Sequence, residues 1–433
     1  MPPYDRQILR LAIPSIVSNI TVPLLGMVDV TIVGHLGDAA YIGAIAVGAM
    51  IFNVIYWIFG FLRMGTSGMT AQALGARQLT DVMQLLMRSL SVGLMVALAV
   101  IVFQIPIRQL ALAIVSPEPQ IRSLASTYFN ICVWGAPAML AMYGLTGWYI
   151  GMQNTRFPMV ISITQNVVNI AASLFMVFVF KMGIRGVAFG TVVAQYAGLA
   201  LSLALLWSYY HRWWKFMRWK GLYDKLKMLR FFKVNSDIFI RTLFLVAVNF
   251  YFLAAGSRQG AVILAVNTLL MQLFILFSYV MDGFAFAGEA LCGKYYGAEN
   301  HDAFHAVLKR LFVWGMIVVV AFTIVYLIGG QSFLSLFTDD DAVLNAAVEF
   351  FPWAIVIPVA GVAAFIWDGV FIGITETRGM LYSSVIATVI FFVVYIAFRT
   401  AWHNHALWSA FILYLISRGI IQTIIIRYCK KVS

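Results

Sequence analysis

Charged residues are scarce in this chain, and no polar stretch is long enough to form a soluble domain. Of the 433 residues, only 11% are charged and 62% are hydrophobic, and the mean hydropathy is +0.91. Soluble globular proteins carry about 25% charged residues, so the composition excludes a soluble enzyme or binding module. The apolar runs are far longer than the roughly ten alternating residues of a barrel strand, which predicts an all-α integral membrane protein.

Cysteine and histidine are also few, which argues against metal sites and enzymes. The three cysteines, Cys132, Cys292 and Cys429, lack metal-ligand spacing and are typical of small apolar residues in or beside helices. Six histidines fall at expected helix ends or loops: His35, His211, His301, His305, His403 and His405. A membrane enzyme is therefore a remote alternative, and we expect no enzymatic activity, no bound metal and no cofactor.

Long apolar runs recur along nearly the whole chain. A helix needs about 20 residues to cross a bilayer, and twelve runs meet that length: 8–33, 41–74, 82–103, 120–150, 157–180, 186–211, 231–256, 260–297, 302–329, 343–373, 378–398 and 405–428. The first run lacks a small-residue cleavage site, so we expect no cleavable signal peptide. The pattern predicts twelve transmembrane helices.

The distribution of lysine and arginine predicts the orientation. If both termini are cytoplasmic, 20 of the 29 basic residues lie on the cytoplasmic side and 6 lie outside, while Arg63, Arg241 and Arg418 lie within spans. The positive-inside rule therefore favours a multi-pass protein with both termini in the cytoplasm. This topology accounts for the net charge of +12 without a nucleic-acid partner.

The longest polar stretch divides the chain near its middle. Residues 211–233 hold eight basic residues interleaved with aromatic ones, which is typical of a segment at the cytoplasmic interface, with anionic-lipid sensing as an alternative. We expect an N-terminal lobe of six helices at 1–211, a basic and aromatic linker at 212–230, and a C-terminal lobe of six helices at 231–433.

The two halves repeat at a constant offset of 222 residues. The motif IGMQNTR at 150–156 returns as IGITETR at 372–378, and LGA at 74–76 returns as YGA at 296–298. The pair Gly147 and Gly151, whose spacing lets helices approach closely, returns as Gly369 and Gly373. Parallel repeats of this kind predict two lobes related by a pseudo-two-fold axis along the membrane normal, as in secondary transporters.

The first span carries a single acid, Asp29, beyond two prolines. Pro14 and Pro23 remove backbone donors and favour bends in this helix. Asp29 has no basic residue within a turn or two along the same helix, and burial in hydrocarbon disfavours its charged form. We therefore interpret this helix as a moving part whose acid takes up a proton or pairs with a cation.

Polar residues of the fifth span form a stripe that could serve Asp29. Asn166, Asn169 and Ser173 are spaced three and four residues apart, so they share one helix face. Together with Thr191 in the next span, they could offer oxygen ligands to Na⁺ or hydrogen bonds to a protonated acid. Hydrogen bonding between helices alone is the alternative.

Charged residues also occur within the second half. Asp237 and Arg241 are four residues apart with the acid first, the order that pairs best on a helix, so we expect them to pair with each other. Asp282, Glu289 and Asp368 are further candidates for a structural or a coupling role. Arg63 of the second span is a candidate charge partner for any of these acids.

Several segments resemble the multidrug and toxic compound extrusion (MATE) transporters. In the first half these are GMVD at 26–29, GHLG at 34–37 and FLRMGTSGMTAQALGA at 61–76. In the second half AVN at 265–267, DGFAFAGEAL at 282–291, GKYYGA at 293–298 and DGVFIG at 368–373 are similar to the DinF branch. The resemblance covers the whole chain and implies two six-helix lobes and efflux of organic, often cationic, compounds coupled to H⁺ or Na⁺.

The resemblance also implies roles for individual residues. Asp29 matches the first-helix acid that couples cations in this family, and Pro14 matches the proline at which that helix is thought to bend. Asp368 resembles an acid implicated in cation binding in other branches. Many members carry an aspartate where this chain has Ser173, so we expect Asp29 to carry most of the coupling in its lobe.

The resulting hypothesis is a monomeric antiporter in the cytoplasmic membrane of a bacterium, with the lipid bilayer and a small-molecule substrate as its partners. The alternative is a flippase for a lipid-linked precursor, which requires a cavity lined with cationic residues for a pyrophosphate. The buried charges favour the antiporter, because the acids Asp29, Asp282, Glu289 and Asp368 outnumber Arg63.

Overall fold

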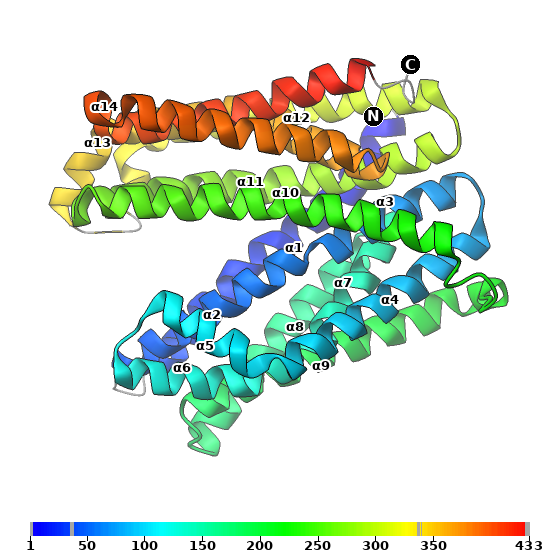
Figure 1. The fold of residues 1–433 in the computed structure, drawn as a ribbon, viewed down its shortest axis with the longest axis horizontal. Helices are drawn as coiled ribbons and strands as arrows, with labels where there is room; N and C mark the ends of the chain where they lie inside the picture. The colour runs from blue at the N-terminus through cyan, green and yellow to red at the C-terminus, as the bar shows by residue number, and fades with distance from the viewer. Residues whose placement is uncertain (1–2, 35–38, 336–337, 339, 429–433) are drawn as a thin grey trace. The chain divides into compact units, whose positions relative to one another are not determined.

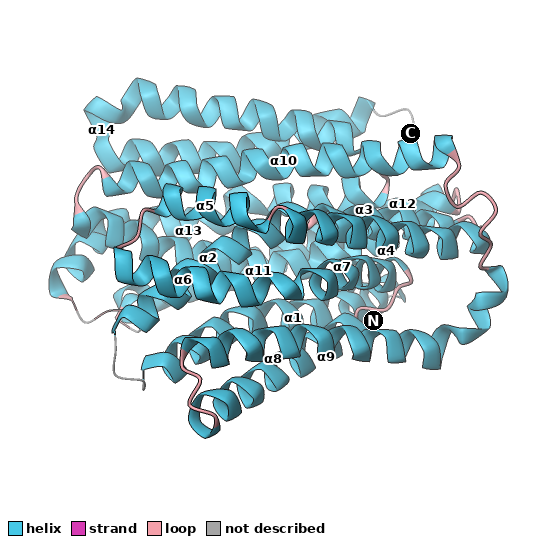
Figure 2. Cartoon of the chain, turned by 60° about the horizontal axis from the view of Figure 1, so that its bottom comes forward, coloured by secondary structure: helices cyan, strands magenta, loops and turns pink. Residues whose placement is uncertain are grey.

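The computed structural model describes residues 3–34, 39–335, 338 and 340–428, and describes their side chains except at 22–30, 33–34, 39 and 331. Throughout this part of the chain the regular structure is helical and contains no strand, as Figure 2 shows. The predicted all-α fold class is therefore confirmed.

Contacts divide the chain into two compact units. The N-terminal unit is Val17–Phe231, and the C-terminal unit is Phe232–Ser433 together with Met1–Ile16. This division differs from the expected lobes at two places. The first 16 residues pack with the C-terminal unit, although helix α1 (Pro3–Gly34) continues into the N-terminal one. The whole of the expected linker, 212–230, packs with the N-terminal unit.

The N-terminal unit consists of the second half of α1 and the helices that follow (Figure 1). These are α2 (Ala39–Phe59), α3 (Phe61–Gly75), α4 (Leu79–Val102), α5 (Gln104–Val115), α6 (Pro119–Cys132), η1 (Val133–Gly135), α7 (Ala136–Gly151), α8 (Arg156–Leu174), η2 (Phe175–Val179), α9 (Ile184–Tyr210) and η3 (His211–Phe216). Here η2 is a short π-helix that continues α8.

The C-terminal unit consists mainly of five long helices, α10 to α14. They are α10 (Lys225–Ser257), α11 (Ala261–Gly297), α12 (His301–Leu334), α13 (Asp341–Gly373) and α14 (Thr377–Tyr428). Helix α13 packs against α11, α12 and α14. Helix α10 begins six residues before the expected span, so the end of the predicted linker is helical.

The helices confirm the twelve expected spans. Ten described segments are long and apolar enough to cross a membrane. One of them, α14, has 52 residues and is broken at His403, where φ is 46°, so it provides two spans. Helix α1, with 32 residues, is long enough for the remaining one.

The internal repeat corresponds to the same close helix contact in each unit. A Cβ atom on Gly147 of α7 would overlap the backbone of Arg63 in α3, and one on Gly369 of α13 would overlap the backbone of Ala285 in α11. Arg63 and Ala285 are themselves 222 positions apart. A Cβ on Gly151 would likewise lie 2.7 Å from a carbonyl oxygen of α3, and one on Gly373 would lie 2.8 Å from a carbonyl oxygen of α11.

The linker is fixed by two polar side chains of α4. The buried Arg88 donates from Nε to the Leu222 carbonyl at 2.6 Å and from Nη2 to the Gly221 carbonyl at 3.1 Å. Gln84 donates to the carbonyls of Arg218 and Lys220, each at 3.2 Å. These bonds satisfy the buried guanidinium and explain why the linker belongs to the N-terminal unit.

We expect the variant Gly369→Ala to lower the stability of the protein by about 1–3 kcal/mol, because the new methyl group would press on the α11 backbone. The matched control is Gly361→Ala on the same helix, whose Cβ would have the Phe277 and Phe365 rings as its nearest neighbours, at 3.4 Å. Thermal unfolding in detergent measures both. Equal melting temperatures for the two variants would contradict the assigned helix contact.

Candidate functional site

Three predicted site residues form a hydrogen-bonded chain in the N-terminal unit. Ser173 Oγ donates to Asn169 Oδ1 at 3.2 Å, and Asn169 Nδ2 donates to Thr191 Oγ1 at 3.3 Å. Thr191 donates its own proton to the Val187 carbonyl, one turn earlier on α9, at 3.1 Å. Asn169 is 1% exposed and Ser173 is fully buried. The structure therefore brings together side chains from the fifth and sixth spans, as the polar stripe predicted.

The chain of donors has a chemical direction. Ser173 donates to Asn169, Asn169 donates to Thr191, and Thr191 donates to a backbone carbonyl, so the hydroxyl protons of Ser173 and Thr191 are already used. The hydroxyl oxygens of Ser173 and Thr191 keep lone pairs. The cluster can accordingly accept a hydrogen bond from an acid or offer oxygen atoms to a cation.

Asn166, the first residue of the predicted stripe, connects α8 to α1. Its Nδ2 donates to the Thr21 carbonyl at 3.0 Å, and Thr21 Oγ1 lies 3.3 Å from Ser162 Oγ. These contacts place the second half of α1 beside the helix that carries Asn169 and Ser173. They lie within one compact unit.

The surroundings of Ser173 are tightly packed. A Cβ on Gly190 of α9 would overlap the Ser173 side chain, so the glycine is what lets the two helices approach here. The π-helix Phe175–Val179 follows Ser173 closely, with Phe180 N donating to the Phe175 carbonyl. Such π-segments occur frequently at functional sites because they break the regular register of a helix.

The first helix passes through both prolines without interruption. Pro14 is buried in α1, and residues 3–34 are helical throughout. The side chains of Pro23 and Asp29 lie outside the described residues. A bend at either proline and the contacts of Asp29 therefore stay predictions.

The first half of α1 is anchored in the C-terminal unit. Asp5 accepts from Trp314 Nε1 at 3.3 Å and pairs with Arg310 at 3.8 Å, and Gln7 accepts from the Tyr295 hydroxyl at 2.8 Å. A Cβ on Gly283 of α11 would lie 2.9 Å from the Ala12 carbonyl oxygen, so α1 and α11 also approach closely. These contacts explain the grouping of the first 16 residues.

A buried charge cluster lies in the C-terminal unit. Asp368 of α13 pairs with Arg241 of α10 and with Arg418 of α14, the latter at 2.5 Å. Gln422 Nε2 donates to the other carboxylate oxygen at 2.7 Å. All four side chains belong to residues that are less than 9% exposed. One carboxylate is thus shared by two guanidinium groups and an amide.

This arrangement corrects the expected pair of Asp237 and Arg241. Arg241 pairs with Asp368, and Asp237 accepts a hydrogen bond from the Thr377 hydroxyl at 2.8 Å. The prediction was wrong because helical spacing considers only neighbours on the same helix. Asp368, an acid on another helix, offers Arg241 a buried partner.

Sequence reasoning missed two members of this cluster. Arg418 and Gln422 are four residues apart on the last span, so they share a face, and an arginine in an apolar span needs an acidic partner. That signal was available but did not identify the partner. The predicted excess of buried acids over bases also needs correction, since both Arg241 and Arg418 are buried.

The other candidates are placed less specifically. Glu289 is 1% exposed on α11, and Asp282 on the same helix lies within electrostatic range of Arg241 and Tyr279. Arg63 is half-buried on α3, within electrostatic range of Tyr143. Among the described residues no group of three or more His, Cys, Asp or Glu side chains could hold a metal ion.

Comparison with known proteins gives consistent results along the chain. Residues 14–175 and 238–396 match the MatE family. The chain is 33% identical over 423 residues to DNA damage-inducible protein F of Escherichia coli, covering 96% of this chain and 90% of that protein. It is 22% identical over 357 residues to a probable multidrug resistance protein NorM of Thermotoga maritima, covering 80% of this chain and 75% of that protein.

Solved structures share the fold at low sequence identity. A MATE crystal structure in the bent conformation superposes with a TM-score of 0.89 at 17% identity, covering 98% of this chain and 95% of the other. A mutant of the Vibrio cholerae MATE transporter VcmN gives a TM-score of 0.87 at 13% identity, with 99% and 98% coverage. On the family match and the E. coli relative, the chain belongs to the MatE family of multidrug and toxic compound extrusion transporters and resembles its DinF branch.

Proposed function

We propose that this protein is a cation-coupled antiporter that exports organic compounds, cationic or amphiphilic in character, in exchange for H⁺ or Na⁺. The observation that carries the proposal is the Asn166–Asn169–Ser173–Thr191 group packed in one unit with the second half of α1. It acts as a monomer in the cytoplasmic membrane of a bacterium, with both termini in the cytoplasm.

The register of α1 and α8 supports a site at Asp29. These helices are the first and fifth spans, so they cross the membrane in the same direction. Asp29 lies eight residues beyond Thr21, about 12 Å along a helix. Ser162 and Asn166 of α8 are the neighbours of Thr21. Eight residues further along α8 are positions 170 and 174, and Ser173 lies between them.

The coupling step follows from the cost of a charge in the membrane. An ionised aspartate at the bilayer centre costs about 2.5–3.5 kcal/mol on insertion scales. A proton or Na⁺ that neutralises Asp29 removes that cost, and the hydroxyl oxygens of Ser173 and Thr191 then bind the protonated acid or the ion. To shift a two-state equilibrium from 1:99 to 99:1, the cation must favour one state by about 5.5 kcal/mol. The movement is a bend of α1 near Pro14 and Pro23.

The charge cluster of the C-terminal unit has a structural role in this proposal. Asp368 already has two guanidinium partners, so its carboxylate is neutralised before any coupling cation arrives. Coupling is thereby assigned to the N-terminal unit alone. The cluster instead ties α10, α13 and α14 together.

The flippase alternative gains one observation. Arg241 and Arg418 are the buried cationic residues that a pyrophosphate site requires. Both of them donate to Asp368, however, so much of their charge is already compensated within the protein. The antiporter is therefore the proposal that the described contacts favour.

We expect Asp29→Asn to abolish gradient-driven efflux of a fluorescent cationic dye from reconstituted vesicles, because the amide carries no charge for a cation to neutralise. Dye binding at equilibrium should persist. The matched control is Asp302→Asn, which removes an exposed acid from the first turn of α12. Full-rate efflux by the Asp29 variant under an imposed gradient would refute the mechanism.

Substitutions in the polar chain should distinguish the coupling ions. If Na⁺ binds there, Thr191→Val and Ser173→Ala remove oxygen ligands and weaken Na⁺ binding. Each loss of about 1.4 kcal/mol in binding free energy raises the Na⁺ concentration for half-maximal efflux about tenfold. If H⁺ couples, the same variants change the pH dependence and leave the response to Na⁺ flat. Vesicles with separately imposed pH and Na⁺ gradients give the measurement. Unaltered responses to both ions would exclude the polar chain from coupling.

We expect Asp368→Asn to destabilise the protein by about 3–5 kcal/mol, because two buried guanidinium groups lose their counter-charge. Asp237→Asn, which keeps an acceptor for Thr377, should cost far less. Thermal unfolding in detergent and efflux per folded molecule are the two readouts. A stable Asp368→Asn variant that has lost ion coupling would show that Asp368 has a coupling role after all.

A further inference from the structure

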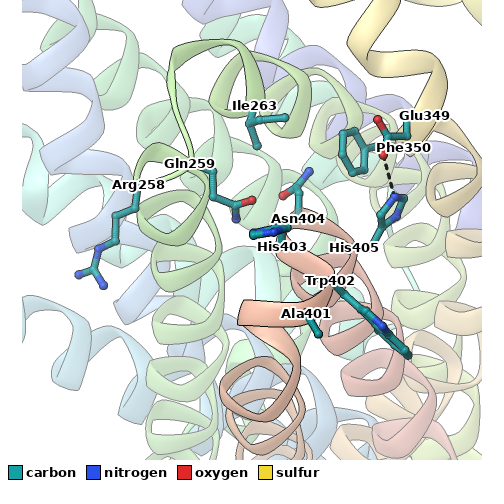
Figure 3. Close-up of a pocket in the computed structure, with 10 residues that line it drawn as sticks. All are labelled: Arg258, Gln259, Ile263, Glu349, Phe350, Ala401, Trp402, His403, Asn404 and His405. Carbon is teal, nitrogen blue, oxygen red and sulfur yellow. Dashed lines mark hydrogen bonds and ion pairs between the residues drawn. The ribbon is translucent and has the colours of Figure 1, made fainter.

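A cavity of about 630 Å³ opens at one end of the C-terminal unit. It lies where α10 ends, α11 and α13 begin, and α14 is broken, which is the outer side in the expected topology. Figure 3 shows ten lining residues: Arg258, Gln259, Ile263, Glu349, Phe350, Ala401, Trp402, His403, Asn404 and His405. Its floor is rigid, because the buried Asn404 exchanges two hydrogen bonds with Asn267, at 2.8 and 2.9 Å.

His403 reaches this cavity in a strained backbone conformation. Its φ and ψ are 46° and −119°, a combination that residues with a Cβ rarely adopt. Other helix connections with this geometry use glycine: Gly183 between η2 and α9 has φ 55° and ψ −134°, and Gly330 has φ 42° and ψ −130°. The turn between the last two spans therefore carries an imidazole where glycine would fold more easily. Strain of this kind clusters at binding sites.

His405 links Trp353 to the Glu349 carboxylate at the edge of the cavity. Trp353 Nε1, which can only donate, bonds to His405 Nδ1 at 3.0 Å, so the ring proton of the neutral imidazole is on Nε2. Nε2 faces Glu349 Oε1 at 3.0 Å. Nε2 therefore donates to the Glu349 carboxylate. Among the described residues that line the cavity Glu349 is the only acid, and Arg258 points away from the other side chains in Figure 3.

The remaining lining groups suit a positively charged amphiphile. The Phe350 ring lies 4.7 Å from the His405 ring, and Trp402 is 52% exposed at the edge of the cavity. Gln259 donates its amide proton to the Ala255 carbonyl, which leaves its amide oxygen as an acceptor. The His403 imidazole makes no hydrogen bond to a described residue. Aromatic faces, acceptor atoms and one carboxylate are what an organic ammonium ion binds.

We propose that this cavity is an outer subsite at which an amphiphilic organic cation binds through Glu349, His403 and the aromatic edge on its way out of the protein. The subsite rests on the proposed export function and deepens it, because it adds a binding step in the C-terminal unit.

The test uses ethidium as the cationic probe and a single reactive cysteine as a local reporter. Ala401 is exposed and lines the cavity, so the variant Ala401→Cys places a thiol there. The same protein carries Cys429→Ser, so that this cysteine does not react with the label. Cys132 and Cys292 are buried and are kept. We expect saturating ethidium to slow maleimide labelling of the purified protein at position 401 several-fold.

Two substitutions of acidic residues test whether the Glu349 carboxylate itself binds the cation or whether any nearby negative charge is enough. Glu349→Gln should abolish the protection, whereas Asp341→Asn, which removes an exposed acid from the same helix outside the cavity, should retain it. Vesicles that export ethidium under a gradient while position 401 stays unprotected would overturn the subsite and leave the export function standing. Protection without any gradient-driven export would support the subsite and refute the export function.

The variant His403→Gly tests the strained residue itself. Removing the Cβ relieves the backbone, so we expect a higher melting temperature than in the parent protein. We also expect weaker protection by ethidium, because the imidazole is lost. A higher melting temperature with unchanged protection would overturn the binding role of His403.

Discussion

Close backbone contact between helices α3 and α7, repeated between α11 and α13, is the constraint on which both units depend. Within a bilayer, helix association gains little from the hydrophobic effect, so it relies on van der Waals packing that small residues permit. Gly147 and Gly369 occupy equivalent positions in this contact, each against a backbone 84 residues earlier in the chain. Helices α4 and α9 pack against α7, and helices α12 and α14 pack against α13.

The two units treat buried polarity in different ways. The N-terminal unit holds a neutral chain of hydroxyls and amides that ends on a backbone carbonyl. The C-terminal unit holds a carboxylate clamped by two guanidinium groups, and removal of one partner would leave an uncompensated charge. The first arrangement fits the proposed coupling site, and the second fits the proposed structural role of the charge cluster.

The sequence was sufficient for the features that depend on length and spacing. Twelve apolar runs, the 222-residue repeat and the stripe of Asn169 and Ser173 all reappear as helices and contacts, because hydropathy and helical periodicity act locally. The sequence could not predict which side chains pair between helices that are distant in the chain. The spacing of Asp237 and Arg241 indicated a local pair, but Arg241 reaches an acid 127 residues away. The membership of α1 in two units was also unpredictable, since its anchoring depends on residues such as Tyr295 and Trp314 far along the chain.

Helix α1 is where the two units are joined within one element. Its first turns are held by Asp5, Gln7 and Ala12, while Thr21 is held by Asn166 of the N-terminal unit. The boundary between the units, after Ile16, falls between Pro14 and Pro23, where the backbone lacks donors. The bend proposed near Pro14 and Pro23 would fall at this boundary. The proposed neutralisation of Asp29 would act beyond it, in the part of α1 that belongs to the N-terminal unit.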